Sequence, residues 1–383
     1  MKFLHTADLH IGKSIYEFNM LEEQRYILEE ILRIAGEEQV DAILLAGDIY
    51  DRSVPNTEAV QLLEWFLMEA LRIAPVFMIS GNHDSAERLS FGAGLMEKSG
   101  LYIAGGKDVK EVVLKDPHGA IAFHLLPFVK PAVVGTGSSE EAVAKQLIKL
   151  RDNWEAVDRH VLLTHFFVCA GGKAPELSDS EQREYVGGLE QVDVSLFEGY
   201  DYVAMGHIHK PQCMKRGQAY YAGSPLCYSF SECNVTEAFG GKGVFIVGLD
   251  ADGEVGIWRK PLHPKRNMRI VKGSLSDIIR QGNESVEGRE DYIQAILTDK
   301  EELIDPIGSL RSVYPNTMQV VLEKRLIEGN TPLFHGAESK AKSMEELFGA
   351  FYEALAGEAM DEVRSKLVQE IAAEVEGTEG KSL

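Results

Sequence analysis

The chain has 383 residues, of which 45% are hydrophobic and 26% charged, and this ordinary globular balance suits two or three domains. No apolar run approaches the roughly 18 residues that cross a bilayer, no signal-peptide core follows Met1, and the four cysteines form no C-x-x-C pair, so we expect a cytoplasmic chain without a disulfide framework. The net charge of −21 argues against a chain that binds DNA through many of its own cations, although a metal site or a partner can supply positive charge.

From residue 1 to about 255, short apolar segments alternate with helical patterns. Strands are predicted at 3–6, 42–46, 76–80, 161–164 and 202–205. One predicted helix carries Leu21, Leu28, Leu32 and Ala35 on one face, and a second, after the N-cap Asn56, carries Val60, Leu63, Leu67 and Leu71. The alternation predicts an α/β domain with layered sheets and helices.

The character of the sequence changes near residue 258. Six cations occur there with no acidic residue among them: Arg259, Lys260, Lys265, Arg266, Arg269 and Lys272. This basic cluster fits a strand pair that contacts DNA, and equally a solvated sheet edge that charge protects from further pairing. The segments at 275–281, 292–297 and 318–322 predict a small α+β domain over residues 256–328. A linker at 329–342 and two amphipathic helices at 343–376 complete the predicted order.

Five polar motifs each follow a predicted strand directly. They are Asp8-x-His10, Gly47-Asp48, Gly81-Asn82-His83-Asp84, His165 and Gly206-His207-Ile208-His209. Taken singly, each motif also fits a turn or a hydrogen-bonded structural group. Residues at the carboxyl ends of strands in an α/β sheet converge on one crevice, so we expect the five motifs to meet.

The residue types in these motifs indicate metal chemistry. Carboxylate, imidazole and amide oxygen without thiolate suit Mn²⁺ or Fe²⁺ and tolerate Zn²⁺. Seven such ligands are too many for one ion with an open coordination position, and they suit two ions that share one bridging carboxylate. Two neighbouring ions can activate a hydroxide and brace an in-line phosphoryl displacement, so the sequence predicts a two-metal phosphoesterase.

The ordered motifs resemble the calcineurin-like metallophosphoesterase superfamily. More narrowly, the stretches at 5–10, 46–51, 201–212, 221–232 and 310–316 resemble the SbcD family of nuclease subunits, so the resemblance covers nearly the whole chain. It implies a two-sheet sandwich with flanking helices over residues 1–255, a DNA-capping domain over 256–328 and a partner-binding tail over 343–376.

The resemblance also implies a role for each motif residue. Asp8, His10 and His209 would bind one metal ion; Asn82, His165 and His207 would bind the other; and Asp48 would bridge them. His83 would face the phosphate without binding metal, and Asp84 would orient the His83 ring. Some relatives have a histidine where this chain has Asp51, and we expect Asp51 to be a turn or supporting residue.

The implied activity is hydrolysis of DNA phosphodiester bonds by a hydroxide that two ions, expected to be Mn²⁺, activate. The complex would be a 3′→5′ double-strand exonuclease and a single-strand endonuclease. The chain has no P-loop, so ATP would be handled by an SMC-like ATPase partner, SbcC, in a heterotetramer that contains a homodimer of this chain. Two alternatives stay open: a phosphatase or cyclic-nucleotide phosphodiesterase that acts on small substrates, and a non-catalytic scaffold.

Overall fold

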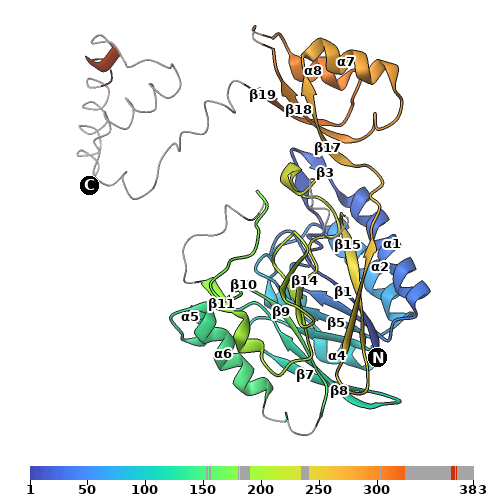
Figure 1. Ribbon diagram of the computed structural model, residues 1–383, viewed down its shortest axis with the longest axis vertical. Coiled ribbons are helices and arrows are strands. Elements are labelled where there is room, and N and C mark those ends of the chain that lie inside the picture. The colour runs from blue at the N-terminus through green and yellow to red at the C-terminus, as the bar shows by residue number, and fades with distance from the viewer. Residues whose placement is uncertain are drawn as a thin grey trace.

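The computed structural model describes residues 1–151, 154, 157–179, 181, 190–233, 241–299, 301, 303–323, 364–366 and 368. Its largest part contains two six-stranded sheets (Figure 1). The first has the order β16 (Val255–Pro261), β15 (Gly243–Leu249), β1 (Lys2–Thr6), β4 (Ala42–Ala46), β5 (Val76–Ile79) and β6 (Leu101–Ala104). The second has the order β13 (Gln212–Lys215), β14 (Ala219–Tyr221), β12 (Tyr202–Gly206), β9 (His160–His165), β8 (Gly119–Leu126) and β7 (Lys110–Asp116). The five predicted strands are confirmed as β1, β4, β5, β9 and β12.

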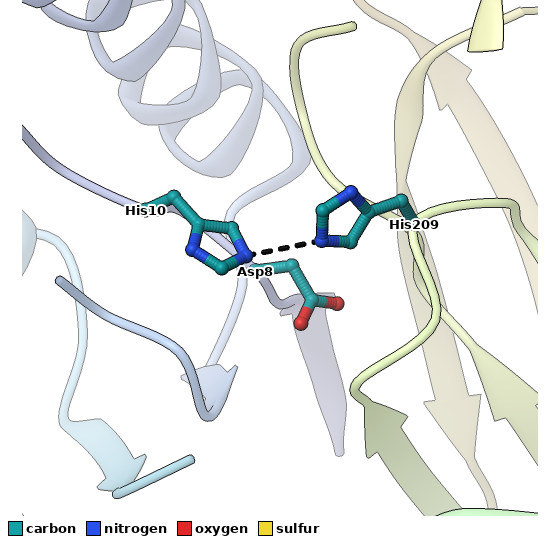
Figure 2. Close-up of side chains that lie close together, drawn as sticks. All are labelled: Asp8, His10 and His209. Carbon is teal, nitrogen blue, oxygen red and sulfur yellow. Dashed lines mark hydrogen bonds between the residues drawn. The ribbon is translucent and has the colours of Figure 1, made fainter. Parts of the chain in front are cut away.

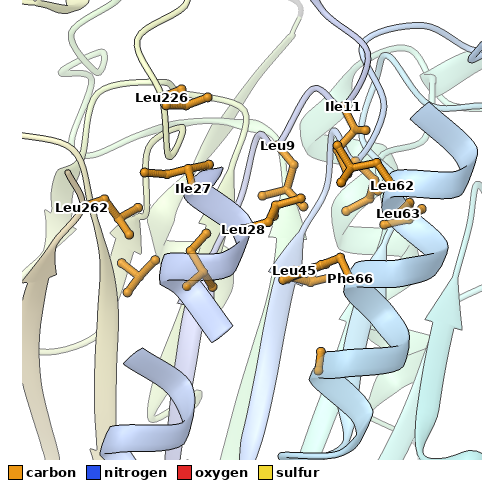
Figure 3. Close-up of a cluster of buried hydrophobic side chains, with 14 of the residues drawn as sticks. Leu9, Ile11, Ile27, Leu28, Leu45, Leu62, Leu63, Phe66, Leu226 and Leu262 are labelled. Atoms are coloured by element: carbon orange, nitrogen blue, oxygen red, sulfur yellow. The ribbon is translucent and has the colours of Figure 1, made fainter. Parts of the chain in front are cut away.

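Three hydrophobic cores separate four layers of structure. The inner core lies between the sheets, where Phe3 and Phe77 of the first sheet meet Phe123 of the second. A second core lies under α1 (Leu21–Glu38) and α2 (Thr57–Leu71), which cover the first sheet (Figure 3). A third lies under α6 (Ser139–Leu150) on the second sheet. Because both faces of each sheet are covered, central strands are apolar throughout, and all five residues of β4 are buried. The predicted α/β sandwich with flanking helices is confirmed.

Helix α2 begins as predicted, and its buried face overlaps most of the predicted one. The Asn56 side chain accepts a hydrogen bond from the Ala59 N–H at 2.8 Å, which confirms the N-cap. The buried residues of α2 are Ala59, Leu62, Leu63, Phe66 and Ala70. Of the predicted face, Leu63 is buried, Leu67 and Leu71 are partly buried against the same core, and only Val60 is exposed, at 45%.

Strand β16 continues the first sheet past residue 255, where the sequence predicts a domain boundary. It pairs antiparallel with β15 along its whole length, from Val255 opposite Leu249 to Pro261 opposite Gly243. The sheet of the first domain therefore continues to Pro261. β16 is an edge strand, and none of its residues is fully buried. Its polar and basic composition differs from that of the buried strands, which is why the sequence suggests a new domain there.

A smaller unit follows, with β17 (Met268–Gly273), α7 (Leu275–Glu284), β18 (Tyr292–Leu297), α8 (Pro306–Arg311) and β19 (Thr317–Leu322). Its three strands are parallel in the order β17-β18-β19, so the described part has βαβαβ connectivity. The helices pack on a separate small core. The predicted linker at 329–342 lies outside the described residues, as does the helical pair at 343–376 apart from 364–366 and 368. Among the described helices, none has the length and apolarity needed to cross a membrane.

Acidic side chains pair with most of the basic cluster. The ion pairs are Lys260–Glu38, Lys265–Glu22, Arg266–Glu22, Arg266–Glu23, Arg269–Asp291 and Lys272–Glu323. Arg259 donates instead to the backbone carbonyl of Gly241. The glutamates that bind Lys260, Lys265 and Arg266 all lie in α1, so these cations fasten the segment before the small unit to the first domain. Of the two interpretations left open by the sequence, the pairing favours a structural role for this cluster.

Candidate metal centre

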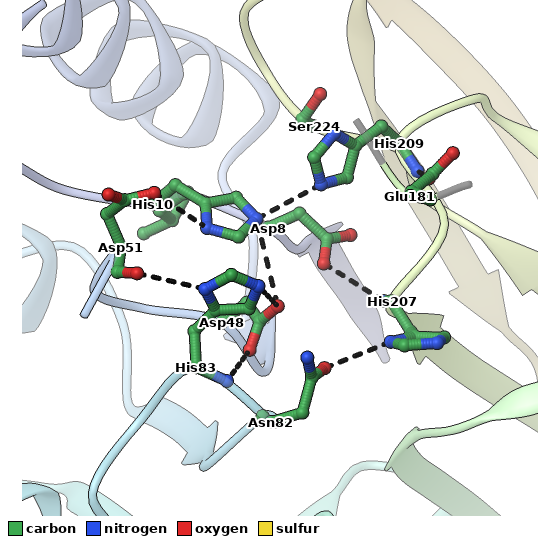
Figure 4. Close-up of polar contacts among 12 residues, drawn as sticks. Asp8, His10, Asp48, Asp51, Asn82, His83, Glu181, His207, His209 and Ser224 are labelled. Carbon is green, nitrogen blue, oxygen red and sulfur yellow. Dashed lines mark hydrogen bonds and ion pairs between the residues drawn. The ribbon is translucent and has the colours of Figure 1, made fainter. Parts of the chain in front are cut away.

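The five motifs meet where the parallel strands of both sheets end. β1, β4 and β5 lead into the motifs from the first sheet, and β9 and β12 lead into them from the second. Backbone hydrogen bonds join the loop after β1 to the loop after β4. The Asp8 N–H donates to Gly47 O at 3.1 Å, and the His10 N–H donates to Asp48 O at 3.0 Å. Figure 4 shows the side chains of these loops gathered around one centre. The expected convergence is confirmed.

The loops reach this centre through unusual backbone geometry. Asp8, Asp48 and His207 have positive φ angles of 53°, 48° and 98°, a region that non-glycine residues rarely adopt. The glycines matter for close packing as well as for turns. A Cβ at Gly81 would collide with Asp48, and one at Gly206 would collide with the backbone carbonyl at the end of β4.

Asp8, His10 and His209 form the first group of donor atoms (Figure 2). All three are buried, and the Nε2 atoms of His10 and His209 lie 3.0 Å apart. Asp8 Oδ2 has no hydrogen-bond partner within the described part of the chain. Burial lowers the pKa of His10 well below its usual value, whereas the nearby carboxylates, chiefly Glu232, raise the pKa of His209 against the effect of burial. Facing imidazole nitrogens beside a free carboxylate oxygen fit a divalent cation.

Asn82, His165 and His207 form the second group. Asn82 Oδ1 lies 3.0 Å from His165 Nε2 and 3.0 Å from His207 Nδ1. His165 Nδ1 lies 2.8 Å from a backbone carbonyl of β4, which directs its Nε2 toward the centre. Burial opposes a charge on His165, but Asp48 and Asp8 outweigh burial and raise the pKa of His165 to about 9. The site therefore favours a positive charge here, and a metal ion would replace the proton.

Asp48 lies between the two groups. Its Oδ2 atom is 3.4 Å from His165 Nε2 and 3.7 Å from His10 Nε2. Its Oδ1 atom accepts a hydrogen bond from the His83 N–H at 2.9 Å. Burial alone would raise the pKa of Asp48, but the surrounding histidines hold the pKa well below its usual value. Asp48 thus presents a charged carboxylate to both groups, which is the position that a bridging ligand requires.

His83 faces the same centre from the loop after β5. Its Nε2 lies 3.9 Å from Asp48 Oδ2, and its Nδ1 lies 2.9 Å from the backbone carbonyl of Asp51. The Asp51 carboxylate in turn pairs with Lys13 Nζ at 2.5 Å. Asp51 therefore supports the His83 ring through its backbone, a contact that the side-chain type did not suggest.

Asp84 organises the backbone around His83. Its carboxylate accepts hydrogen bonds from the N–H groups of Gly81, Tyr50 and Ile49 at 2.9, 2.9 and 3.1 Å. Burial and the charge of Asp48 raise the pKa of Asp84 to about 6, against the lowering effect of these bonds. These bonds join the loops after β4 and β5, and orientation of the His83 ring by Asp84 stays a prediction.

Three supporting residues were not identified from the sequence. Glu232 is fully buried, and its Oε1 atom lies 3.3 Å from His209 Nδ1 while its Oε2 atom pairs with Lys242 Nζ at 2.7 Å. The Tyr228 hydroxyl donates to the Leu9 carbonyl beside the His10 ring. The available signal was a pair of opposite charges, Glu232 and Lys242, within otherwise buried segments. A carboxylate on the second nitrogen of a metal-binding histidine fixes its tautomer and raises its basicity.

The segment after β10 (Phe167–Cys169) also reaches the first group. Residues 171–174 are exposed, but Ser178 and Glu181 are buried. Glu181 accepts a hydrogen bond from the backbone N–H of His209, so this loop also supports the first group.

The donor atoms overlap in a way that suits more than one ion. Three sets of ligand atoms each lie within 4.8 Å of one another: Asp8–His10–His209, His10–Asp48–His83 and Asp8–Asp48–His165. Asp8, His10 and Asp48 each belong to two sets. The sets contain carboxylate and imidazole donors, and Asn82 adds an amide oxygen. These residues fit a pair of closely spaced divalent ions.

Comparisons with known proteins show the family of the chain. Residues 1–211 match the family described as calcineurin-like phosphoesterase, and residues 264–355 match the family described as type 5 capsule protein repressor C-terminal domain. The chain is 31% identical to the protein of Staphylococcus saprophyticus named as the D component of nuclease SbcCD, over 97% of each chain. It is also 31% identical to the protein of the same name from Staphylococcus epidermidis, over 99% of this chain and all of that one. The crystal structure of the protein TT1561 from Thermus thermophilus is 14% identical and covers 67% of this chain and 98% of its own, with a TM-score of 0.41.

Proposed function

The chain belongs to the SbcD family of calcineurin-like phosphoesterases, and from that premise we propose that it is the nuclease subunit of an SbcCD-type DNA repair complex. The proposed reaction is hydrolysis of DNA phosphodiester bonds, as a 3′→5′ exonuclease on duplex ends and an endonuclease on single strands, in the cytoplasm. The observation that carries the proposal is the convergence of both donor groups on the charged carboxylate of Asp48.

Each residue of the centre has a proposed task. Asp8, His10 and His209 would hold one ion, Asn82, His165 and His207 the other, and Asp48 both. Two Mn²⁺ ions would supply the Lewis acidity that activates water and stabilises phosphoryl charge. His83 would contribute a ring nitrogen to the phosphate, because its Nδ1 is held at the Asp51 carbonyl and its Nε2 points to the centre.

Cleavage of end-labelled DNA tests the activity. The purified chain should cut single strands when Mn²⁺ is added, and it should digest duplex ends when the ATPase partner and ATP are also present. Activity on a small chromogenic diester with none on DNA, even with the partner, would instead indicate a small-substrate phosphodiesterase. Protein purified without chelators that carries no transition metal, and gains no activity on adding one, would indicate a scaffold.

Residues 343–376 are proposed as the tether to the ATPase. Their sequence predicts two amphipathic helices, and such faces suit docking on a coiled coil. Removal of residues 343–383 should spare metal binding and single-strand cutting but abolish co-purification with SbcC and ATP-dependent duplex digestion. A truncated chain that still co-purified and digested duplex DNA would contradict this assignment.

A second copy of the chain is the proposed occupant of an apolar surface on the first domain. Four exposed apolar residues line one cleft between α2 and the segment that holds the short helices α3 (Ala86–Leu89) and α4 (Ala93–Met96): Val60, Met68, Phe91 and Met96. The exposed Leu95 precedes Met96 in α4. Phe91 and Leu95 are 81% and 82% exposed. Grouped exposure of this kind is uncommon on monomers, and it supports the proposed homodimer.

A further inference from the structure

A cleft of about 220 Å³ opens beside the second donor group. Asn82 and His207 form part of its wall, and Figure 4 shows their side chains facing each other at this side of the centre. Phe128, Phe166 and Phe167 also line this cleft. An apolar, aromatic wall has no task in binding metal ions or a phosphate, so it requires another explanation.

Phe128 is the aromatic residue most available to a ligand. Phe166 and Phe167 are buried, whereas Phe128 is only partly buried and packs against Phe166 with ring centroids 5.5 Å apart. The Phe128 N–H donates to the Ser80 carbonyl at 2.9 Å, at the end of the strand that leads into Asn82. Phe128 is thus held in a fixed place next to the second donor group.

The remaining lining is mixed in charge. Lys130 is exposed and brings a cation to the cleft, and Leu177 adds apolar surface. Ser139 and two carboxylates, Glu181 and Glu190, also line the cleft. Glu181 already accepts hydrogen bonds from Ser178 and the backbone of His209. Aromatic and apolar surface beside a cation is the combination that binds a nucleotide, with the base stacked and the phosphate near the positive charge.

We propose that this cleft binds the nucleobase of the nucleotide next to the scissile phosphate, with Phe128 as the stacking platform. The inference rests on the proposed nuclease function and adds a subsite to it. Because every base has a flat face, stacking accepts all four bases, which suits an enzyme that digests DNA of any sequence. Lys130 would lie near the backbone phosphate of the same nucleotide.

A base-dependence experiment tests this subsite. Two short single strands are compared with Mn²⁺, one with normal bases and one with an abasic tetrahydrofuran residue beside the labelled phosphodiester. The wild-type chain should cut the normal strand with a kcat/KM roughly tenfold higher, mainly through KM, as the usual effect of one stacked base predicts. Phe128→Ala should cut the normal strand at the abasic rate and leave the abasic rate unchanged.

Two control variants separate stacking from damage to the fold. Phe128→Trp keeps an aromatic platform and should retain the preference for the normal strand. Val133→Ala changes an apolar residue that is 60% exposed in α5 (Pro131–Val134), outside the cleft, and should behave as wild type. Equal cutting of the two strands by the wild type, or an undiminished preference in Phe128→Ala, would overturn the proposal.

If the chain cuts no DNA, a binding experiment still tests whether the cleft holds a nucleobase. Titration of deoxyadenosine monophosphate, followed by NMR or calorimetry, should show binding to the wild type that Phe128→Ala weakens roughly tenfold. Nucleotide binding without cleavage would reject the nuclease activity while keeping the subsite. Equal binding to both proteins would reject the subsite whatever the activity is.

Discussion

At the scale of single residues, Asp48 gives the most direct test of the proposed two-metal centre. Its Oδ2 atom lies 3.4 Å from His165 Nε2 and 3.7 Å from His10 Nε2, so it faces one histidine of each donor group. Asp48→Ala should therefore lower the metal content from two ions per chain to none, rather than to one. Metal analysis after dialysis, with the exposed Asp108→Asn as a control, measures the change. A variant that kept two ions would contradict the bridging assignment.

His83 should be separable from metal binding. Its ring is held by the Asp51 carbonyl, and its backbone N–H, not its ring, contacts Asp48 within hydrogen-bond distance. His83→Ala should retain both ions and lower kcat about 10²–10⁴-fold, the usual effect of losing a positioned acid–base or charge-stabilising group. Metal content and single-turnover rate are measured on the same preparation. Loss of an ion together with activity would make His83 a ligand, as its place in one of the three donor sets also allows.

Glu232 should control how tightly His209 binds its ion. Glu232→Gln preserves size but removes the charge that faces His209 Nδ1, so one of the two ions should bind about 10–100-fold more weakly. Titration calorimetry with Mn²⁺ measures both affinities. Because the change also leaves Lys242 buried without its partner, the free energy of unfolding should fall. The double variant Glu232→Gln/Lys242→Met should recover stability without recovering affinity, and recovery of both would reduce Glu232 to a purely structural role.

The residues of the centre differ in how well the sequence alone predicts them. The candidate ligands were predictable because each follows its strand directly, so a local pattern marks it. Glu232 and Lys242 carried only a weaker signal, opposite charges within buried segments, and their contact with the centre is set by packing between separate segments. Asp51 acts on His83 through a backbone carbonyl, which every residue has, so side-chain type carried no information about it.

At the scale of elements, strand existence was easier to predict than which face of a helix is buried. Strands covered on both faces are continuously apolar, which makes β4 plain in the sequence. Helix α2 is apolar on more sides than one core needs, so the predicted face included the exposed Val60 and left out the buried Leu62 and Phe66. Edge strand β16 lacks the apolar signature, and its pairing with β15 became evident only from the register. The surplus apolar surface of α2 also has a consequence for assembly.

Charge placed on the exposed apolar residues of α4 and the turn before it, next to α2, should convert the proposed homodimer to a monomer. Phe91→Asp and Leu95→Asp put a carboxylate where apolar side chains are more than 80% exposed, so neither should disturb the core. Light scattering coupled to size-exclusion chromatography should show a dimer for the wild type and a monomer for each variant. Ile148→Asp is the matched control, since Ile148 is 69% exposed on α6, and it should remain dimeric. A wild type that is already monomeric at micromolar concentration would remove this surface as the dimer interface.

At the scale of the whole molecule, net charge and cation pairing limit how the chain can hold DNA. The net charge is −21, and the basic cluster that might have offset it is bound mainly to Glu22, Glu23, Glu38, Asp291 and Glu323. The net charge follows from composition alone. The pairing of the basic cluster does not, because the acidic partners in α1 are more than 200 positions away from Lys260, Lys265 and Arg266, and only the fold brings them together.

The isolated chain should therefore bind duplex DNA weakly and with little dependence on salt. Each phosphate neutralised contributes about 0.9 to the slope of log K against log salt, so a chain with most clustered cations already paired should show a slope of magnitude below about 3. Fluorescence anisotropy with a labelled duplex, between 50 and 200 mM salt, measures this slope. Addition of the ATPase partner should steepen it, because new phosphate contacts would come from the partner. Glu22→Gln/Glu23→Gln frees Lys265 and Arg266 and should steepen the slope of the isolated chain by one to two units, whereas the exposed Glu58→Gln on α2 should change it by less than half a unit. A steep slope of log K against log salt for the unmodified chain alone would mean that cations outside the paired cluster bind the phosphates.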